Sequence, residues 1–275
     1  MNKITIGLIQ IKPQNSQKDN LAKAIRLIQN ARKRGAQIIC LPELFKSVYF
    51  PQTKTRKNFE LAERIPGPSS RLFMDLARKL KAVLIVPLFE QAQNKNYYNS
   101  LVVIDSDGST VGKYRKTHLP NDPCFYEKFY FQKGDLGFKI FETAYGKIGT
   151  LICWDQWFPE AARKLALMGA QIIFYPSAIG WHDCQTLTER KKEQVAWEMV
   201  QRSHAIANGV FVASVNRIGR EGKLNFWGNS FVSGPFGELL AKASSNKEEI
   251  LIVNCDLDQI SRVRKYWPFL KEKAK

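Results

Sequence analysis

Apolar and polar residues follow two different periods along this chain, and their succession predicts alternating strands and helices. The apolar run at residues 3–11 predicts a strand. Residues 18–34 carry leucine and isoleucine at helical spacing, and Gly35 is a typical residue at which a helix ends. The β-branched segment AQIICLPE at 36–43 then predicts a buried strand that ends at Pro42.

The middle of the chain repeats this order. Residues 148–153 predict a strand, residues 159–168 predict a helix, and Gly169 ends that helix. The pentapeptide GAQII stands at 35–39 and again at 169–173, each time with a proline three residues later. Because the copies recur in the same strand–helix–glycine–strand–proline frame, they indicate two related halves.

Further elements extend each half. The first half continues with a helix at 68–81, a strand at 82–90 and a hairpin at 99–120 that turns at Ser106-Asp107-Gly108. The second continues with a helix near 187–208 and strands within 210–219, 228–241 and 249–258. Two sheets that each carry helices on one face can pack together. We therefore expect an α/β fold, a four-layer α-β-β-α sandwich with an internal pseudo-twofold, as a single domain over residues 1–275.

The charge of the chain changes this picture little. The sequence has 42 Lys+Arg against 25 Asp+Glu, a net charge of +17, which raises the alternative of a basic protein that binds nucleic acid or a membrane surface. The positive residues are scattered, however, so we expect a generally basic surface and neither of these partners. The chain has no apolar stretch near the ~20 residues of a membrane span, and its N-terminal apolar run is too short for a signal peptide.

The cysteines bear on both chemistry and location. They number five, at irregular spacing with no CxxC pair, and the chain has only three histidines. This composition favours neither a disulfide framework nor a metal site, and we expect a reducing, cytoplasmic location. Cys40 and Cys255 lie in apolar strands and are expected in the core, whereas Cys184 is expected in a loop.

Three polar residues stand near the ends of predicted strands, namely Glu43, Lys116 and Cys153. Ligands collect beyond the carboxyl ends of parallel strands. A carboxylate that takes a proton, a thiol that attacks and an ammonium that stabilises an oxyanion together suit acyl transfer. Each residue alone also has an ordinary structural explanation, as a helix cap, a solvated lysine or a core cysteine.

The segments around these residues add a resemblance. LPELF, GKYRKTHLP and ICWDQWFPEAAR resemble the signature segments of the nitrilase superfamily of carbon–nitrogen hydrolases, and the likeness extends to GNSFVSGPFGELL. The family's catalytic glutamate, lysine and cysteine correspond to Glu43, Lys116 and Cys153, and its second glutamate corresponds to Glu127. The resemblance implies the four-layer fold, a cysteine acyl-enzyme, no metal or other cofactor, and a homodimer or larger homo-oligomer.

Within the superfamily, YEKFYFQKGDLGFK and WGNSFVSGPFGE resemble the branch that converts N-carbamoylputrescine to putrescine, carbon dioxide and ammonia, a step of polyamine biosynthesis. A small carbamoyl amine is thus the implied substrate. Two features depart from the branch: Cys124 stands where a small residue is expected, and the tail YWPFLKEKAK differs. The alternative is an amidase or ureidopropionase-type hydrolase with another amide or carbamoyl substrate. A ureido acid would favour an arginine clamp, for which Arg217 is the candidate.

An ammonium substrate needs local negative charge and aromatic faces, because a net charge of +17 repels it. Asp183 and Glu127 are candidate carboxylates, and Asp155 could instead cap a helix. The Trp154 N–H can donate to the oxyanion beside Lys116, and if the helix from Pro159 begins close behind Cys153, its positive end would favour the thiolate. The candidate substrate-binding residues are Tyr49, Asp122, Tyr130, Trp154, Asp155, Ser177 and Ala178.

Overall fold

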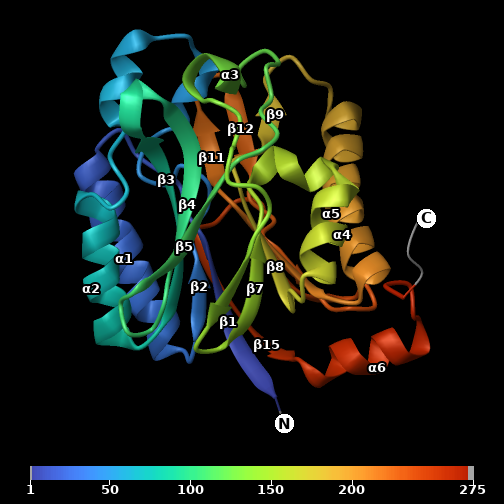
Figure 1. The fold of residues 1–275 in the computed structure, drawn as a ribbon. Helices are drawn as coiled ribbons and strands as arrows, with labels where there is room; N and C mark the ends of the chain where they lie inside the picture. Colours follow the sequence, from blue (N-terminus) through green and yellow to red (C-terminus); the bar gives the residue numbers. More distant parts are fainter. Residues whose placement is uncertain (1, 272–275) are drawn as a thin grey trace.

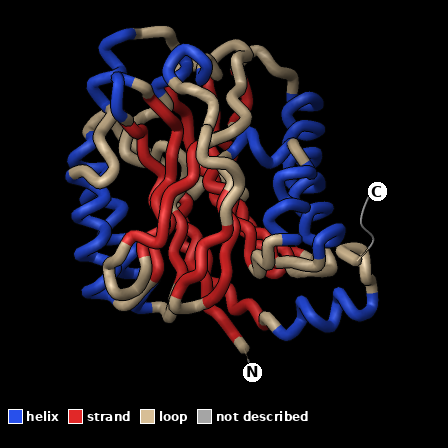
Figure 2. Tube along the Cα trace, viewed as in Figure 1, coloured by secondary structure: helices blue, strands red, loops and turns tan. Residues whose placement is uncertain are grey.

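Two six-stranded mixed sheets lie face to face at the centre of the molecule, and helices cover their outer faces (Figures 1 and 2). The structure is a computed structural model and describes residues 2–271, so residues 1 and 272–275 of the expected domain lie outside it. The first sheet has the order β15 (Glu249–Asp256), β1 (Lys3–Gln10), β2 (Ile38–Cys40), β3 (Val83–Gln91), β4 (Tyr97–Ile104), β5 (Thr110–Arg115). The second has the order β14 (Leu239–Lys242), β13 (Phe231–Ser233), β10 (Phe211–Asn216), β8 (Ile172–Ser177), β7 (Gly146–Thr150), β6 (Ile140–Thr143).

The outer layers are two pairs of helices. Helices α1 (Gln17–Lys33) and α2 (Pro68–Leu80) cover the first sheet, and α4 (Pro159–Leu167) and α5 (Leu187–Asn208) cover the second (Figure 1). The remaining elements are α3 (Glu127–Tyr130), α6 (Asp258–Tyr266), a small antiparallel sheet of β11 (Ile218–Glu221), β12 (Leu224–Trp227) and β9 (Gly180–His182), and 3₁₀ helices at Phe50–Gln52, Arg56–Leu61, Gln93–Lys95 and Cys153–Trp157.

The order of the strands confirms the internal pseudo-twofold. The series β15-β1-β2-β3-β4-β5 corresponds strand for strand to β6-β7-β8-β10-β13-β14. In both series the first pair is antiparallel, the next two pairs are parallel and the last two are antiparallel. The four-layer α-β-β-α sandwich expected from the sequence is therefore the fold of this chain.

The repeated pentapeptide owes its identity to this symmetry. Gly35 follows α1 with a φ of 95°, and Gly169 follows α4 with a φ of 102°. Glycine adopts this left-handed conformation without the steric cost that other residues incur. Both halves therefore use the same residue to end the helix and lead the chain back into the sheet.

The alanine of the pentapeptide is fixed by a close approach between helix and sheet. Ala36 and Ala170 are fully buried. A Cβ atom placed on Gly7 of β1 would lie 2.9 Å from the Cβ of Ala36, and one on Gly149 of β7 would lie 3.4 Å from the Cβ of Ala170. The overlap at Gly7 is with Ala36, and the overlap at Gly149 is with Leu165 Cδ1, at 2.9 Å, so both halves need glycine at this position of the strand.

Alternating side chains of β1 divide the core into layers. Ile6 and Leu8 belong to the large apolar cluster that also contains Phe174 of the second sheet. Ile9 instead joins Ile39 and residues of α1 and α2 in the layer beneath those helices. Successive strand residues point to opposite faces, so both faces of the first sheet are buried. Among the residues described, no helix is long and apolar enough to cross a membrane.

Two boundaries differ from those expected. Strand β2 covers only Ile38–Cys40, and β7 ends at Thr150 rather than continuing to Cys153. After Thr150, the Leu151 N–H still donates to the Phe174 carbonyl, but the chain then turns into the 3₁₀ helix that begins at Cys153. The small sheet of β9, β11 and β12 was not expected at all, because its strands have only three or four residues.

Candidate active site

Loops that leave three strands bring Glu43, Lys116 and Cys153 into the interior. Glu43 lies three residues beyond β2, Lys116 directly follows β5, and Cys153 lies three residues beyond β7. All three are buried, with exposed fractions of 0%, 1% and 5%. Glu43 and Cys153 thus follow parallel strands from different halves of the pseudo-twofold, at the carboxyl ends where α/β sheets usually hold their ligands.

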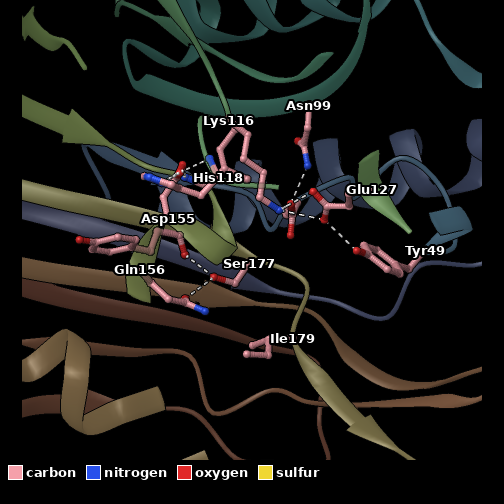
Figure 3. Close-up of polar contacts among 12 residues, drawn as sticks. Tyr49, Asn99, Lys116, His118, Glu127, Asp155, Gln156, Ser177 and Ile179 are labelled. Atoms are coloured by element: carbon pink, nitrogen blue, oxygen red, sulfur yellow. Dashed lines mark hydrogen bonds and ion pairs between the residues drawn. The ribbon is translucent and has the colours of Figure 1, made fainter. Parts of the chain in front are cut away.

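Lys116 is the centre of a buried group of ions (Figure 3). Its Nζ lies 2.8 Å from Glu43 Oε1, and 2.8 and 2.7 Å from Oε1 and Oε2 of Glu127. Asn99 Nδ2 also donates to Glu43 Oε1, at 2.6 Å. Among the residues described, the other oxygen of Glu43, Oε2, has no hydrogen-bond partner. Glu43 is therefore held by one oxygen, while the second is available as a proton acceptor.

Tyr49 fixes the second carboxylate. Its hydroxyl donates to Glu127 Oε1 at 2.8 Å, so this oxygen accepts from both Tyr49 and Lys116 (Figure 3). Tyr49 is itself buried between the rings of Phe125 and Phe226. The phenol thereby holds Glu127 in a fixed orientation against the ammonium.

Burial and charge act in opposite directions on this group of ions. Burial raises the pKa of Glu127 to about 7, although the adjacent Lys116 ammonium acts to lower it. Burial would lower the pKa of Lys116, but the charges of Glu127 and Glu43 outweigh it and hold that pKa above its ordinary value. Lys116 therefore stays charged, and the raised pKa lets Glu127 take up a proton near neutral pH.

The backbone at Cys153 is strained. Its φ of 44° lies in the left-handed region, which costs a residue other than glycine about 1–3 kcal/mol. The residue is the first of the 3₁₀ helix Cys153–Trp157, and this sharp turn brings its side chain to the group around Lys116. Strain of this kind persists only where the surrounding structure enforces it.

Burial and nearby charges set the state of the Cys153 thiol. Helix α4 begins at Pro159, as expected, and the 3₁₀ helix Cys153–Trp157 lies between that helix and the thiol. Burial, together with the charge of Glu43, raises the pKa of the thiol well above its usual value, and Lys116 and a hydrogen bond from the Ala178 backbone only partly oppose this. The resting residue is therefore a thiol, which needs a base before it can attack a carbonyl.

Asp155 links the segments that carry Lys116 and Cys153. One of its oxygens accepts from the His118 N–H at 2.9 Å and contacts His118 Nδ1 at 2.8 Å. The other accepts from the Tyr114 hydroxyl at 2.8 Å and from the Ile152 N–H at 3.0 Å. Both oxygens are thus occupied within the protein. Its local contact with Ile152 matches the capping alternative, and little of the carboxylate is left for a substrate ammonium.

Ser177 ends β8, and Ala178 follows it directly. The Ala178 backbone is the group that hydrogen-bonds Cys153, as noted above. The Ser177 hydroxyl donates to Gln156 Oε1 at 3.2 Å, and the Trp197 indole donates to the same oxygen at 2.9 Å. Trp154 is half-buried, with its ring edge-to-face against a neighbouring tryptophan. Of these residues, only Ala178 is linked directly to the sulfur, while Ser177 and Trp197 hold Gln156.

Three other candidates lie apart from this group. The Tyr130 hydroxyl donates to the Thr53 carbonyl at 2.6 Å, so it holds a neighbouring loop. Asp183 pairs with Arg220 at 2.7 Å on the surface. Asp122 is exposed, and among the residues described no ion pair joins it to the catalytic candidates. Across residues 2–271, no group of three or more histidine, cysteine, aspartate or glutamate residues is placed to hold a metal ion.

The fold and the buried Glu–Lys–Cys arrangement together define an enzyme of the nitrilase superfamily, as the sequence resemblance implies. The chain belongs to the carbon-nitrogen hydrolase family, whose model matches residues 5–265. It is 41% identical to the N-carbamoylputrescine amidase of Solanum lycopersicum, over 98% of this chain and 92% of that protein. It is 38% identical to a citrullinase of Francisella tularensis, over 99% and 96%. A crystal structure of a carbon-nitrogen hydrolase from Helicobacter pylori G27 superposes with a TM-score of 0.95 at 44% identity, covering 98% and 95% of the two chains.

Proposed function

We propose that this hydrolase acts through a Cys153 acyl-enzyme on the carbamoyl group of a small amine, with N-carbamoylputrescine as the substrate. The observation that carries the mechanism is the unpartnered Glu43 Oε2 in a buried group that also holds Lys116 and Cys153. A buried carboxylate oxygen without a partner is a ready acceptor for the thiol proton. No metal or organic cofactor takes part in the proposed steps.

The first half-reaction forms the acyl-enzyme. Glu43 takes the thiol proton as the Cys153 sulfur attacks the ureido carbon, and the carbonyl oxygen becomes an oxyanion. The Lys116 charge and the Trp154 N–H stabilise that oxyanion. When it collapses, the bond from carbon to the terminal –NH₂ breaks, Glu43 returns the proton, and ammonia leaves. A thiocarbamate remains on the sulfur.

The second half-reaction uses the same base. Glu43 takes a proton from water, and the resulting hydroxide attacks the thiocarbamate carbon. The C–S bond breaks, the thiol regains its proton, and a carbamic acid is released. This product decays to carbon dioxide and putrescine. Glu127 and Tyr49 hold Lys116 throughout both steps.

Two observations support an amine as the substrate rather than a ureido acid. The amidase relative at 41% identity is named for N-carbamoylputrescine. In addition, the Arg217 side chain is fully buried, 3.3 Å from Glu221, and donates to the Ser47 carbonyl at 2.6 Å. Among the residues described, Nε and Nη1 of this arginine have no hydrogen-bond partner, but the guanidinium is fully buried and faces the Glu221 carboxylate, which makes it a poor clamp for a substrate carboxylate. Citrulline, which carries both an ammonium and a carboxylate, is the second candidate substrate, because one relative is a citrullinase.

The test is to measure kcat/KM for ammonia release from N-carbamoylputrescine, citrulline and N-carbamoyl-β-alanine. We expect the three substrates to rank in that order. A clear preference for the β-alanine derivative would contradict the proposed substrate and leave the cysteine mechanism intact. The Cys153→Ala variant serves as the control for ammonia from other sources.

The carboxylate that holds the substrate ammonium can be sought in the same assay. Among the residues described, Asp122 and Glu193 form no ion pair, and Glu193 is half-buried with one oxygen bound to Gln185 at 2.7 Å. Loss of the carboxylate that contacts the ammonium should raise KM for N-carbamoylputrescine more than for citrulline. Asp122→Asn and Glu193→Gln are the two variants to compare.

We further propose that the chain forms a homodimer through the outer face of α4 and α5. Leu187, Val195 and Met199 of α5 are 82%, 50% and 64% exposed, and Leu167 and Met168 at the end of α4 are 58% and 41% exposed. Large apolar side chains that are exposed on the surface of a protein commonly mark an interface. A second copy of the chain, related by a twofold axis, would bury this face against itself.

A further inference from the structure

A second buried ion pair lies behind the catalytic candidates, and the proposed reaction does not use it. Arg217 directly follows β10, and Glu221 ends β11 in the small third sheet. Their side chains are 0% and 3% exposed, and Arg217 Nε lies 3.3 Å from Glu221 Oε1. Arg217 also packs its guanidinium against the Phe226 and Tyr49 rings, at 5.2 and 6.0 Å from their centroids. Burial of two charges is costly, and apolar residues of the same size often stabilise a fold better.

The arginine holds the segment that follows the catalytic glutamate. Arg217 Nη2 donates to the Ser47 carbonyl at 2.6 Å and lies 3.5 Å from the Leu44 carbonyl. Leu44 is adjacent to Glu43 and has a φ of 49°, in the left-handed region. A strained residue needs external contacts to keep its conformation. The guanidinium supplies such contacts directly beyond Glu43.

The glutamate of the pair holds the same segment five residues after Leu44. Glu221 Oε2 accepts from the Tyr49 backbone N–H at 2.6 Å, in a fully buried hydrogen bond. The Tyr49 side chain extends in turn to Glu127 Oε1, at 2.8 Å, and Glu127 binds Lys116. An unbroken chain of hydrogen bonds therefore leads from Glu221 through Tyr49 to the second carboxylate of the ion group.

We propose that Arg217 and Glu221 are positioning residues for the hydrolysis: their buried pair fixes the segment from Leu44 to Tyr49, and through it the two carboxylates that flank Lys116. The inference rests on the proposed roles of Glu43 and Lys116. The proposal explains why two charges are buried where an apolar pair would give a more stable fold. The segment needs a donor for the Ser47 carbonyl and an acceptor for the Tyr49 N–H, which apolar side chains cannot provide. Among the residues described, no hydrogen bond or ion pair joins this pair to Cys153, so we assign it a positioning role, to which the charge of Arg217 near Glu43 adds.

The decisive experiment replaces the pair by apolar side chains of similar length, in the double variant Arg217→Met/Glu221→Met. A shift of about 1 Å in a catalytic group can cost about 10² in rate. We expect kcat to fall by about that factor, with a much smaller change in KM, in a protein whose circular dichroism and melting temperature stay close to those of the unchanged chain. Arg220 precedes Glu221 on β11, but its side chain is 68% exposed. Arg220→Met is therefore the matched control and should keep full activity.

A second comparison applies even where the double variant folds poorly. Glu221→Gln keeps an oxygen that can accept from the Tyr49 N–H, whereas Glu221→Met does not, so kcat should be higher for the glutamine variant. Because Glu221 acts through Tyr49, the losses of Glu221→Met and Tyr49→Phe should combine to less than their product. The proposal would be overturned if the losses of kcat from Glu221→Met and Tyr49→Phe multiply in the combined variant. It would also be overturned if a folded Arg217→Met/Glu221→Met variant has a normal kcat.

The two levels of inference fail in different ways. An active Cys153→Ala variant would remove the proposed mechanism itself. An inactive Cys153→Ala variant beside a fully active Arg217→Met/Glu221→Met variant would remove only the positioning role and leave the mechanism standing.

Discussion

Of the five thiols of the chain, Cys153 is the one to which we assign the role of nucleophile. All five cysteines are free, and Cys124 also lies in a loop near the site, with its sulfur 3.3 Å from His182 Nε2. We expect Cys153→Ala to abolish ammonia release without unfolding the protein, because only one buried atom is lost. Cys124→Ala and Cys184→Ala should remain active. Turnover by Cys153→Ala above the background rate would contradict the assigned nucleophile.

Glu127 should leave a signature in the stability of the protein. Its pKa is about 7 in the folded chain, against 4.5 for an ordinary glutamate. Between these two pH values the folded state binds a proton that the unfolded state has released, so the contribution of Glu127 to stability decreases as the pH rises from about 4.5 to 7.

The measurement compares the unfolding free energy of the unchanged chain and of Glu127→Gln in urea, at a series of pH values. The advantage of the unchanged chain over the variant should shrink steadily across this range. A difference that grows with pH would mean that Lys116 lowers the pKa of Glu127 below its ordinary value, so that the ion pair prevails over burial.

At the scale of elements, Asp155 joins β5 to the turn before the nucleophile. Asp155→Ala would leave the Ile152 and His118 N–H groups without their acceptor, whereas the Tyr114 hydroxyl would keep Thr117 Oγ1, at 3.0 Å. Buried donors without partners are costly, so we expect a loss of about 3 kcal/mol in unfolding free energy and a large fall in kcat. Asp122→Ala, which removes an exposed carboxylate, is the control for stability. Equal stability of the two variants would show that the Asp155 contacts carry no net energy.

The sequence allowed the repeated elements to be predicted because their signals are long or paired. The GAQII copies, with Gly35 and Gly169 at the helix ends, revealed the pseudo-twofold, and the motif around Cys153 indicated the site. The strands of the third sheet were missed, since three or four residues are too few to establish a period.

Contacts between distant residues were equally invisible in the sequence. Asn99 is a polar residue in the mainly apolar strand β4. No local pattern in the sequence shows that its side chain donates a hydrogen bond to Glu43. The sequence presents Arg217 as a candidate clamp for a substrate carboxylate, whereas the fold pairs it with Glu221. The positive φ of Cys153 cannot be predicted from its residue type either. Cysteine does not favour this conformation, and the surrounding fold imposes it.

At the scale of the whole molecule, the exposed apolar face of α4 and α5 predicts the oligomeric state. Met199→Lys would place a charge in the centre of the proposed interface, and we expect the molecular mass from light scattering to fall toward that of one chain. Leu72→Lys on α2, at a site 38% exposed on the opposite outer layer, should leave the mass unchanged. An unchanged chain that is already monomeric at micromolar concentration would refute the interface.

The pseudo-twofold has a consequence for the chain during its synthesis. Glu43, Asn99, Lys116 and Glu127 all precede the second half, and Cys153 stands at its first loop. Under the proposed mechanism, a ribosome that has produced Glu43, Lys116 and Glu127 has not yet produced the nucleophile, and a fragment of the second half has the thiol without its base. We therefore expect no hydrolysis by either half of the chain alone. Duplication of one ancestral unit, followed by specialisation of each copy, would make activity a property of the finished protein alone.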